Sequence, residues 1–159
     1  MQLWVLDRNP YIAASMLTDK EIRKMLVEHL QLLSTFFIKC ALYKREYFYK
    51  PIPQGKELVN WISNNLSWSI LYLDALVNEN IKRNKNANSY LSVNVAKKFL
   101  SDFPVKLKAP LKNISFRCKK EYPLYNKLNK QLLPIEDGIK EYLKYHKWNQ
   151  EFKGIKYGL

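Results

Sequence analysis

The chain has 159 residues and carries 27 Lys and Arg against 14 Asp and Glu, a formal net charge of +13 with a pI near 9.7. Apolar residues make up 47% of it, which excludes a disordered tail, and its length suits one domain with its own core. It has no apolar run of about 18 residues and no signal-peptide core, so we expect a soluble, cytoplasmic protein that does not enter a membrane.

The first part of the chain predicts a short helix and then a long one. Pro10 suits the first turn of a helix that continues through Tyr11–Leu17. Thr18 and Glu21 have the spacing of a capping box. Apolar side chains then recur at three- and four-residue spacing, which predicts one helix over about Asp19–Leu42. The side chains that it is expected to bury are Ile22, Met25, Leu26, Leu33 and Phe36.

A basic, tyrosine-rich loop with two prolines is expected over Tyr43–Pro53. Beyond it, apolar positions again step at three and four residues and predict a second long helix over Lys56–Arg83. After a polar turn at Asn84–Asn88, Ser89 is expected to cap a third helix that runs to Leu100.

The remainder of the chain is rich in basic residues. We expect a long basic loop over Asp102–Pro123, a short helical stretch over Tyr125–Leu132, and a last helix that begins at Pro134 and ends near Trp148. The predicted fold is therefore mostly α: one compact helical bundle over residues 1–159, with two long helices, long basic loops and an irregular basic tail from about residue 149.

Several kinds of site are not supported by the sequence. The four glycines form neither a P-loop nor a dinucleotide-binding motif. Cys40 and Cys118 have no Cys or His at zinc-ligand spacing, so we expect two reduced thiols. His29 and His146 form no metal or Ser-His-Asp pattern, and His29 lies on the apolar face of its helix, as a core or boundary residue would. We therefore expect no metal and no cofactor.

The charge of the chain favours a polyanionic partner, because a net charge of +13 repels itself in the folded state. Many of the 11 Tyr stand among basic residues, where a ring can stack on a base while a neighbouring Lys meets a phosphate. Nucleic acid, and DNA rather than RNA, is the expected partner. The alternatives are an anionic membrane surface, an acidic protein, or a compositional bias without functional meaning.

Three segments are candidates for the nucleic-acid interface. The first is the polar stripe of the first long helix, made of Lys20, Lys24, Glu28 and Gln31 at helical spacing. The second is the loop over Tyr43–Pro53, and the third is the aromatic and basic run Tyr142–Trp148. The residues expected to bind are Lys20 and Lys24 in the first, Lys44, Arg45, Tyr49 and Lys50 in the second, and Lys144, Tyr145, Lys147 and Trp148 in the third. The alternatives are a solvated helix face with a Lys24–Glu28 ion pair, and a helix end whose aromatic rings pack inward.

The Asp19–Ser34 segment, which contains this stripe, carries a resemblance to a family. Its matching residues are Asp19-Lys20, Lys24-Met25, Glu28, Gln31 and Leu33-Ser34, followed by Tyr49-Lys50-Pro51. They resemble short phage proteins with the pattern D-K-H-x-x-K-M-x-x-E-x-x-Q-x-L-S and then Y-K-P-T-H-x-N-H-P. Those proteins are distantly similar to the pyrimidine-dimer DNA glycosylases of the phage endonuclease V family, a compact helical fold that uses the chain's own N-terminal amine and one helix glutamate.

This resemblance implies that Glu28 is the catalytic glutamate and that the amine of Met1 is the nucleophile. An α-amino group titrates near ~8, below the ~10.4 of lysine, so a fraction of it is unprotonated at neutral pH. Such an amine can attack the sugar C1′ and form a Schiff base, while the carboxylate handles protons and stabilises the cation. The reaction requires a base to leave the stack.

The chain also departs from the family pattern. Glu21 replaces the histidine of D-K-H, both histidines of the second motif are missing after Pro51, and Gln2 is expected to leave Met1 in place. The first hypothesis is a DNA-binding, glycosylase-like phage protein that excises or handles damaged or modified bases. The second is a catalytically inactive relative that serves as a nucleic-acid-binding or assembly subunit of a viral complex in the host cytoplasm. The third is a protein-binding adaptor, whose binding would depend little on salt.

Overall fold

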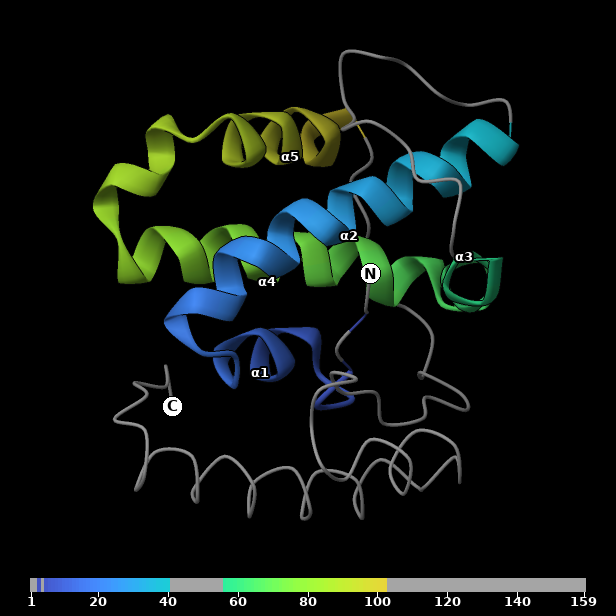
Figure 1. The fold of residues 1–159 in the computed structure, drawn as a ribbon, viewed down its shortest axis with the longest axis horizontal. Helices are drawn as coiled ribbons and strands as arrows, with labels where there is room; N and C mark the ends of the chain where they lie inside the picture. The colour runs from blue at the N-terminus through green and yellow to red at the C-terminus, as the bar shows by residue number, and fades with distance from the viewer. Residues whose placement is uncertain (1–2, 4, 41–55, 103–159) are drawn as a thin grey trace.

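The computed structural model describes residues 3, 5–40 and 56–102, and Figure 1 shows their helices packed together. The elements are α1 (Pro10–Ser15), α2 (Asp19–Lys39), α3 (Lys56–Asn64), α4 (Leu66–Arg83), the 3-10 helix η2 (Lys85–Ser89) and α5 (Leu91–Asp102). Helix α2 crosses α4, with α1 on one side of the crossing and α5 on the other. The predicted mostly α fold is confirmed for the described residues. The loop predicted over Tyr43–Pro53 and the predictions beyond Asp102 lie outside them.

The beginning of α2 agrees with its sequence signal. The Thr18 hydroxyl accepts a hydrogen bond from the Glu21 amide at 3.2 Å, and the Glu21 carboxylate accepts one from the Thr18 amide at 3.1 Å. This reciprocal pair is the predicted capping box. The helix ends at Lys39, short of the predicted Leu42, because the ψ of 5° at Cys40 leaves the α-helical range.

The predicted helix over Lys56–Arg83 is two helices, so this prediction was wrong. Asn65 separates α3 from α4 with φ −134° and ψ 39°, outside the helical range. Its side-chain amide donates to the carbonyl of Trp61 at 3.1 Å, while its own carbonyl accepts the amide of Ser69 and so begins α4. Asparagine competes well for main-chain groups in this way, which favours a break over a continuous helix.

The prediction that Ser89 caps the third helix was also wrong. Ser89 ends the 3-10 helix η2, and its hydroxyl donates to the carbonyl of Asn86 at 2.7 Å. Tyr90, which has extended backbone angles, stands between η2 and α5, and its carbonyl accepts the amide of Asn94. Helix α5 then extends to Asp102, past the predicted end at Leu100.

The core lies between α2 and the helices around it. One of the side chains predicted to be buried in it is only partly buried. Of the five side chains that α2 was expected to bury, four are buried: Ile22, Met25, Leu26 and Leu33. Phe36 is only partly buried, whereas Phe37 is 3% exposed. Phe37 follows Leu30 and Leu33 at helical spacing, and its ring meets that of Phe99 on α5 edge to face, with centroids 5.5 Å apart.

Candidate functional site

The polar stripe on α2 changes character along the helix. Lys20 and Lys24 are exposed, whereas Gln31 is half-buried and only 17% of the Glu28 side chain is exposed. Lys24 Nζ lies 3.5 Å from Glu28 Oε1, which is the ion pair that the helical spacing predicts. The proposed catalytic carboxylate is therefore a largely enclosed group, paired with a lysine that reaches solvent.

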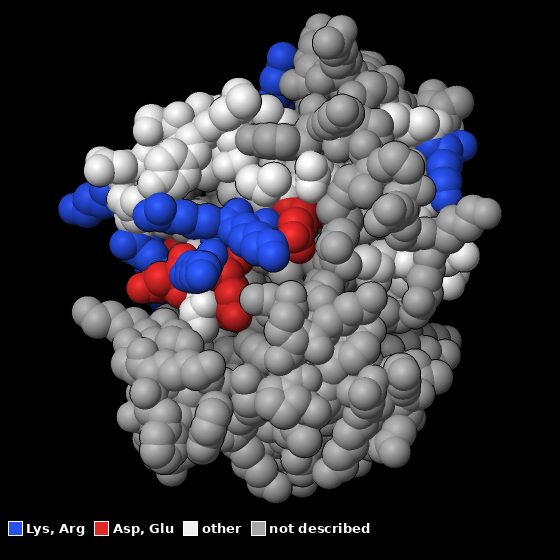
Figure 2. Space-filling model, in the orientation of Figure 1, with Lys and Arg blue, Asp and Glu red and all other residues white. Residues whose placement is uncertain are grey.

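Charged side chains of both signs gather over the N-terminal half of α2 (Figure 2). Lys20, Arg23 and Lys24 are exposed here, and Asp19 supplies an exposed carboxylate at the first position of the helix. Over residues 3, 5–40 and 56–102, 11 Lys and Arg face 8 Asp and Glu, a net charge of +3. The described helices are thus close to electrically balanced.

Most of the positive charge lies elsewhere in the sequence. Residues 103–159 contain 13 Lys and Arg and 5 Asp and Glu, a net charge of +8, and residues 41–55 contribute +2. The sequence-predicted binding residues in these segments lie outside the described residues, as does Met1. They are Lys44, Arg45, Tyr49, Lys50, Lys144, Tyr145, Lys147 and Trp148.

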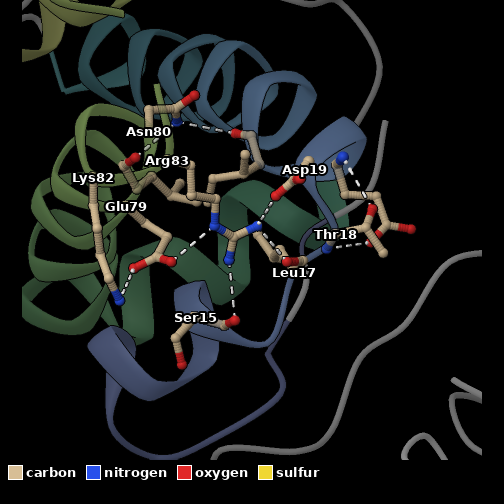
Figure 3. Close-up of polar contacts among 11 residues, drawn as sticks. Ser15, Leu17, Thr18, Asp19, Glu79, Asn80, Lys82 and Arg83 are labelled. Carbon is tan, nitrogen blue, oxygen red and sulfur yellow. Dashed lines mark hydrogen bonds and ion pairs between the residues drawn. The ribbon is translucent and has the colours of Figure 1, made fainter. Parts of the chain in front are cut away.

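Arg83, at the end of α4, donates hydrogen bonds to groups on α4, on α1, in the turn after α1 and on α2 (Figure 3). Its Nε donates to Glu79 Oε1 at 2.8 Å, and its Nη1 donates to Asp19 Oδ1 at 3.1 Å. Nη1 also reaches the carbonyl of Leu17 at 2.6 Å, and Nη2 reaches the carbonyl of Ser15 at 3.1 Å. The guanidinium therefore fastens the end of α4 to the turn between α1 and α2. Only 11% of its side chain is exposed, which indicates a structural role.

A second arginine, Arg23, is exposed on α2 and packs against an aromatic ring. Its guanidinium carbon lies 5.5 Å from the ring centroid of Tyr90, within the range of a cation–π interaction. The Tyr90 hydroxyl accepts a hydrogen bond from Asn84 Nδ2 at 2.8 Å, which fixes the ring. The sequence interpretation did not single out Arg23 or Arg83. Tyr90, the ring beneath Arg23, and the hydrogen-bond partners of the Arg83 guanidinium named above, except Glu79, lie more than 60 residues away along the chain.

His29 is a core residue, as its position on the apolar face of the helix predicts. It is fully buried, and its Nε2 lies 2.6 Å from the carbonyl of Ser69, so Nε2 carries the hydrogen. Burial lowers the pKa of His29 to about 4, although the bond to Ser69 acts in the opposite direction. The ring is therefore neutral at pH 7. Its edge meets the ring of Tyr72 with centroids 5.2 Å apart.

The buried region around His29 contains side-chain polar atoms for which the described residues provide no hydrogen-bond partner. They are His29 Nδ1, Trp61 Nε1, Ser69 Oγ and Tyr72 OH. Burial raises the pKa of Tyr72, with a smaller contribution from the charge of Glu21, so its hydroxyl stays neutral. The described residues contain no group of three or more His, Cys, Asp and Glu that could hold a metal ion.

None of the described helices combines the length and the apolar character that crossing a membrane requires. No protein family, curated protein or solved structure significantly matches the chain.

Proposed function

We propose that the protein binds DNA through its excess of basic residues and acts in the excision or handling of damaged or modified bases. The observation that supports binding is the distribution of charge. The described helical part is nearly balanced at +3, whereas the whole chain carries +13. The other residues of the chain therefore carry most of the net positive charge, and such an excess of basic residues is typical of proteins that bind nucleic acid.

Glu28 supports the catalytic half of the proposal. A carboxylate that is largely removed from solvent acts more strongly on a neighbouring cation than an exposed one does. Its position on α2, a 21-residue helix with a complete capping box, gives it a rigid support. In the proposed reaction, the Met1 amine attacks C1′ and the bond to the base breaks, with the base leaving in protonated form. The C1′–O4′ bond of the sugar then opens, O4′ takes a proton, and C1′ becomes the carbon of an imine cation. Glu28 handles these protons and stabilises the cation.

Borohydride trapping tests the reaction directly. The full chain is incubated with duplexes that carry an abasic site, an ultraviolet lesion or a modified pyrimidine, and the imine is reduced to a stable adduct. We expect a covalent protein–DNA adduct on at least one of these duplexes. A protein that binds every duplex but forms an adduct with none is not an enzyme of this kind.

The inactive relative is the second candidate, and the Lys24–Glu28 pair favours it. A Glu28 carboxylate that is paired with Lys24 at 3.5 Å can serve the helix alone. In that case the protein binds nucleic acid as a subunit of a larger viral assembly. Salt-dependent DNA binding without any trapped adduct is the result that this candidate predicts.

A further inference from the structure

We propose that Lys20, Arg23 and Lys85 form a phosphate-binding surface on the helical part of the protein, where α2 begins and α4 ends. The inference rests on the proposed function, because the partner is nucleic acid. It adds a contact surface within the described helices, two of whose residues, Arg23 and Lys85, were not among the sequence-predicted binding residues.

Hydrogen bonds and one cation–π contact bring the three cations to one end of the described helices. Arg83 joins the last turn of α4 to Asp19, the first residue of α2. The neighbouring Asn84 holds the Tyr90 hydroxyl, and the Tyr90 ring receives Arg23 from α2. Lys20 precedes Arg23 by about one turn of α2, and Lys85 directly follows Asn84.

The acidic residues of this end are engaged with other groups. Asp19 pairs with Arg83, and Glu79 pairs with both Arg83 and Lys82. The Glu21 carboxylate accepts the Thr18 amide in the capping box. Among the described residues, Lys20, Arg23 and Lys85 are exposed and form no ion pair. Their charges are therefore available to an external anion.

Arg23 is the best prepared of the three cations. A guanidinium binds a phosphate through two parallel hydrogen bonds, and stacking on a fixed ring lowers the entropy that it loses on binding. The Tyr90 ring supplies that support while leaving Arg23 exposed. Lys24 is less well prepared, because it lies next to the carboxylate of Glu28. The surface thus differs from the Lys24–Glu28 stripe.

Nucleic acid fits this surface better than an anionic membrane does. Membrane-binding surfaces combine cations with a band of large apolar side chains. Among the described residues of η2 and α5, Leu91 is the single large apolar side chain that is exposed. Binding to the phosphates of a nucleic acid requires the cations but no such apolar band.

The test compares single variants of the full chain by fluorescence anisotropy with a labelled DNA duplex over a range of salt concentrations. The variants are Lys20→Gln, Arg23→Gln and Lys85→Gln. Lys39→Gln is the matched control, because it removes the same charge from an exposed position at the other end of α2. Each of the first three should make the slope of log K against log salt shallower by up to about 0.9, the value for one lost phosphate contact. The control should leave the slope unchanged.

Tyr90 provides a further test that keeps every charge. Tyr90→Leu should weaken binding several-fold, whereas Tyr90→Phe retains the ring beneath Arg23 and should bind more tightly than the leucine variant. Equal affinities of the two variants would contradict the role of the ring. A thermal melt of each variant checks that it remains folded.

The possible failures are distinguishable. If the wild-type chain binds DNA but the four glutamine variants give one common slope, the surface proposed here is wrong and the proposed function stands. If the wild-type chain does not bind DNA at low salt, both fail. The same variants are also tested on phosphatidylcholine vesicles with and without phosphatidylserine. An effect of Arg23→Gln on phosphatidylserine vesicles alone would overturn the assignment to nucleic acid.

Discussion

Arg83 and Leu17 are joined by a hydrogen bond of 2.6 Å from the guanidinium Nη1 to the main-chain carbonyl, across 66 residues of sequence. Carbonyl groups at the end of a helix lack partners within the helix and must find them elsewhere. Arg83 donates to two such carbonyls: that of Ser15, the last residue of α1, and that of Leu17, two residues after it. One side chain thus connects the ends of α1 and α4 with the beginning of α2.

Replacing Arg83 should strongly destabilise the fold. Arg83→Met leaves the Glu79 carboxylate, which is 10% exposed, without its closest cation and leaves both carbonyls without this donor. Breaking an ion pair of this kind costs about 3–5 kcal/mol, and urea denaturation measures it. Lys82→Met is the matched control. Lys82 pairs with the same carboxylate at 3.8 Å but is 70% exposed, so its loss should change the free energy of unfolding by at most about 1 kcal/mol. Equal effects would contradict a central role for Arg83.

The two adjacent phenylalanines of α2 should respond differently to truncation. Phe37 is 3% exposed and meets Phe99, so Phe37→Ala should cost about 3–5 kcal/mol. Phe36 is only partly buried, and Phe36→Ala should cost clearly less. The difference between the two free energies of unfolding is the quantity to measure. A larger loss for Phe36 would mean that the register of α2 against α5 is wrong.

Local signals in the sequence predicted structure better than long-range contacts did. Thr18 and Glu21 are three residues apart, and their capping box depends only on the chain next to it. Apolar periodicity predicted the helical content but did not detect the break at Asn65, because the spacing of apolar residues continues through it from Ile62 to Leu66. A competing side-chain bond to Trp61 decides that break, and periodicity contains no information about it.

The candidate site was predictable to a similar extent. Helical spacing placed Lys24 beside Glu28, and the structure has that pair. It did not indicate that Glu28 would be largely enclosed, because enclosure depends on elements packed from elsewhere. Arg23 was missed for the same reason: only the fold brings Tyr90 beneath it. Contacts between distant segments need the three-dimensional arrangement, and no pattern within one helix reports them.

The stability of the fold should fall as the pH is lowered from about 6.5 to about 4. The pKa of His29 is about 4 in the folded protein and near 6.5 when unfolded, so in this window the unfolded chain binds a proton that the folded chain does not. Protonation therefore favours unfolding, and the loss should be on the order of 3 kcal/mol across the window. Urea denaturation at several pH values measures it.

Two variants separate this effect from other titrations. His29→Leu removes the buried imidazole, and this part of the pH dependence should disappear even if the variant is less stable at pH 7. His146→Asn removes the other histidine of the chain and should leave the dependence in place. An unchanged pH profile in the leucine variant would show that another group causes the acid sensitivity.

Glu28→Gln separates the two candidate functions. Glutamine has nearly the same shape as glutamate, and the ion pair that is lost joins Glu28 to a lysine that is 61% exposed, so the variant should remain folded, as a thermal melt checks. If Glu28 is catalytic, the variant should keep its DNA affinity but lose turnover, because a neutral amide can neither accept the proton nor stabilise the cationic imine. Lys24→Gln is the matched control, since it breaks the same pair and keeps the carboxylate.

Acetylation of the N-terminus should independently prevent trapping, because an amide nitrogen cannot form the imine. Undiminished adduct formation by both the glutamine variant and the acetylated chain would exclude the proposed mechanism. If no substrate gives an adduct with the wild-type chain, the inactive relative becomes the better account, and Glu28 then serves α2 as the partner of Lys24.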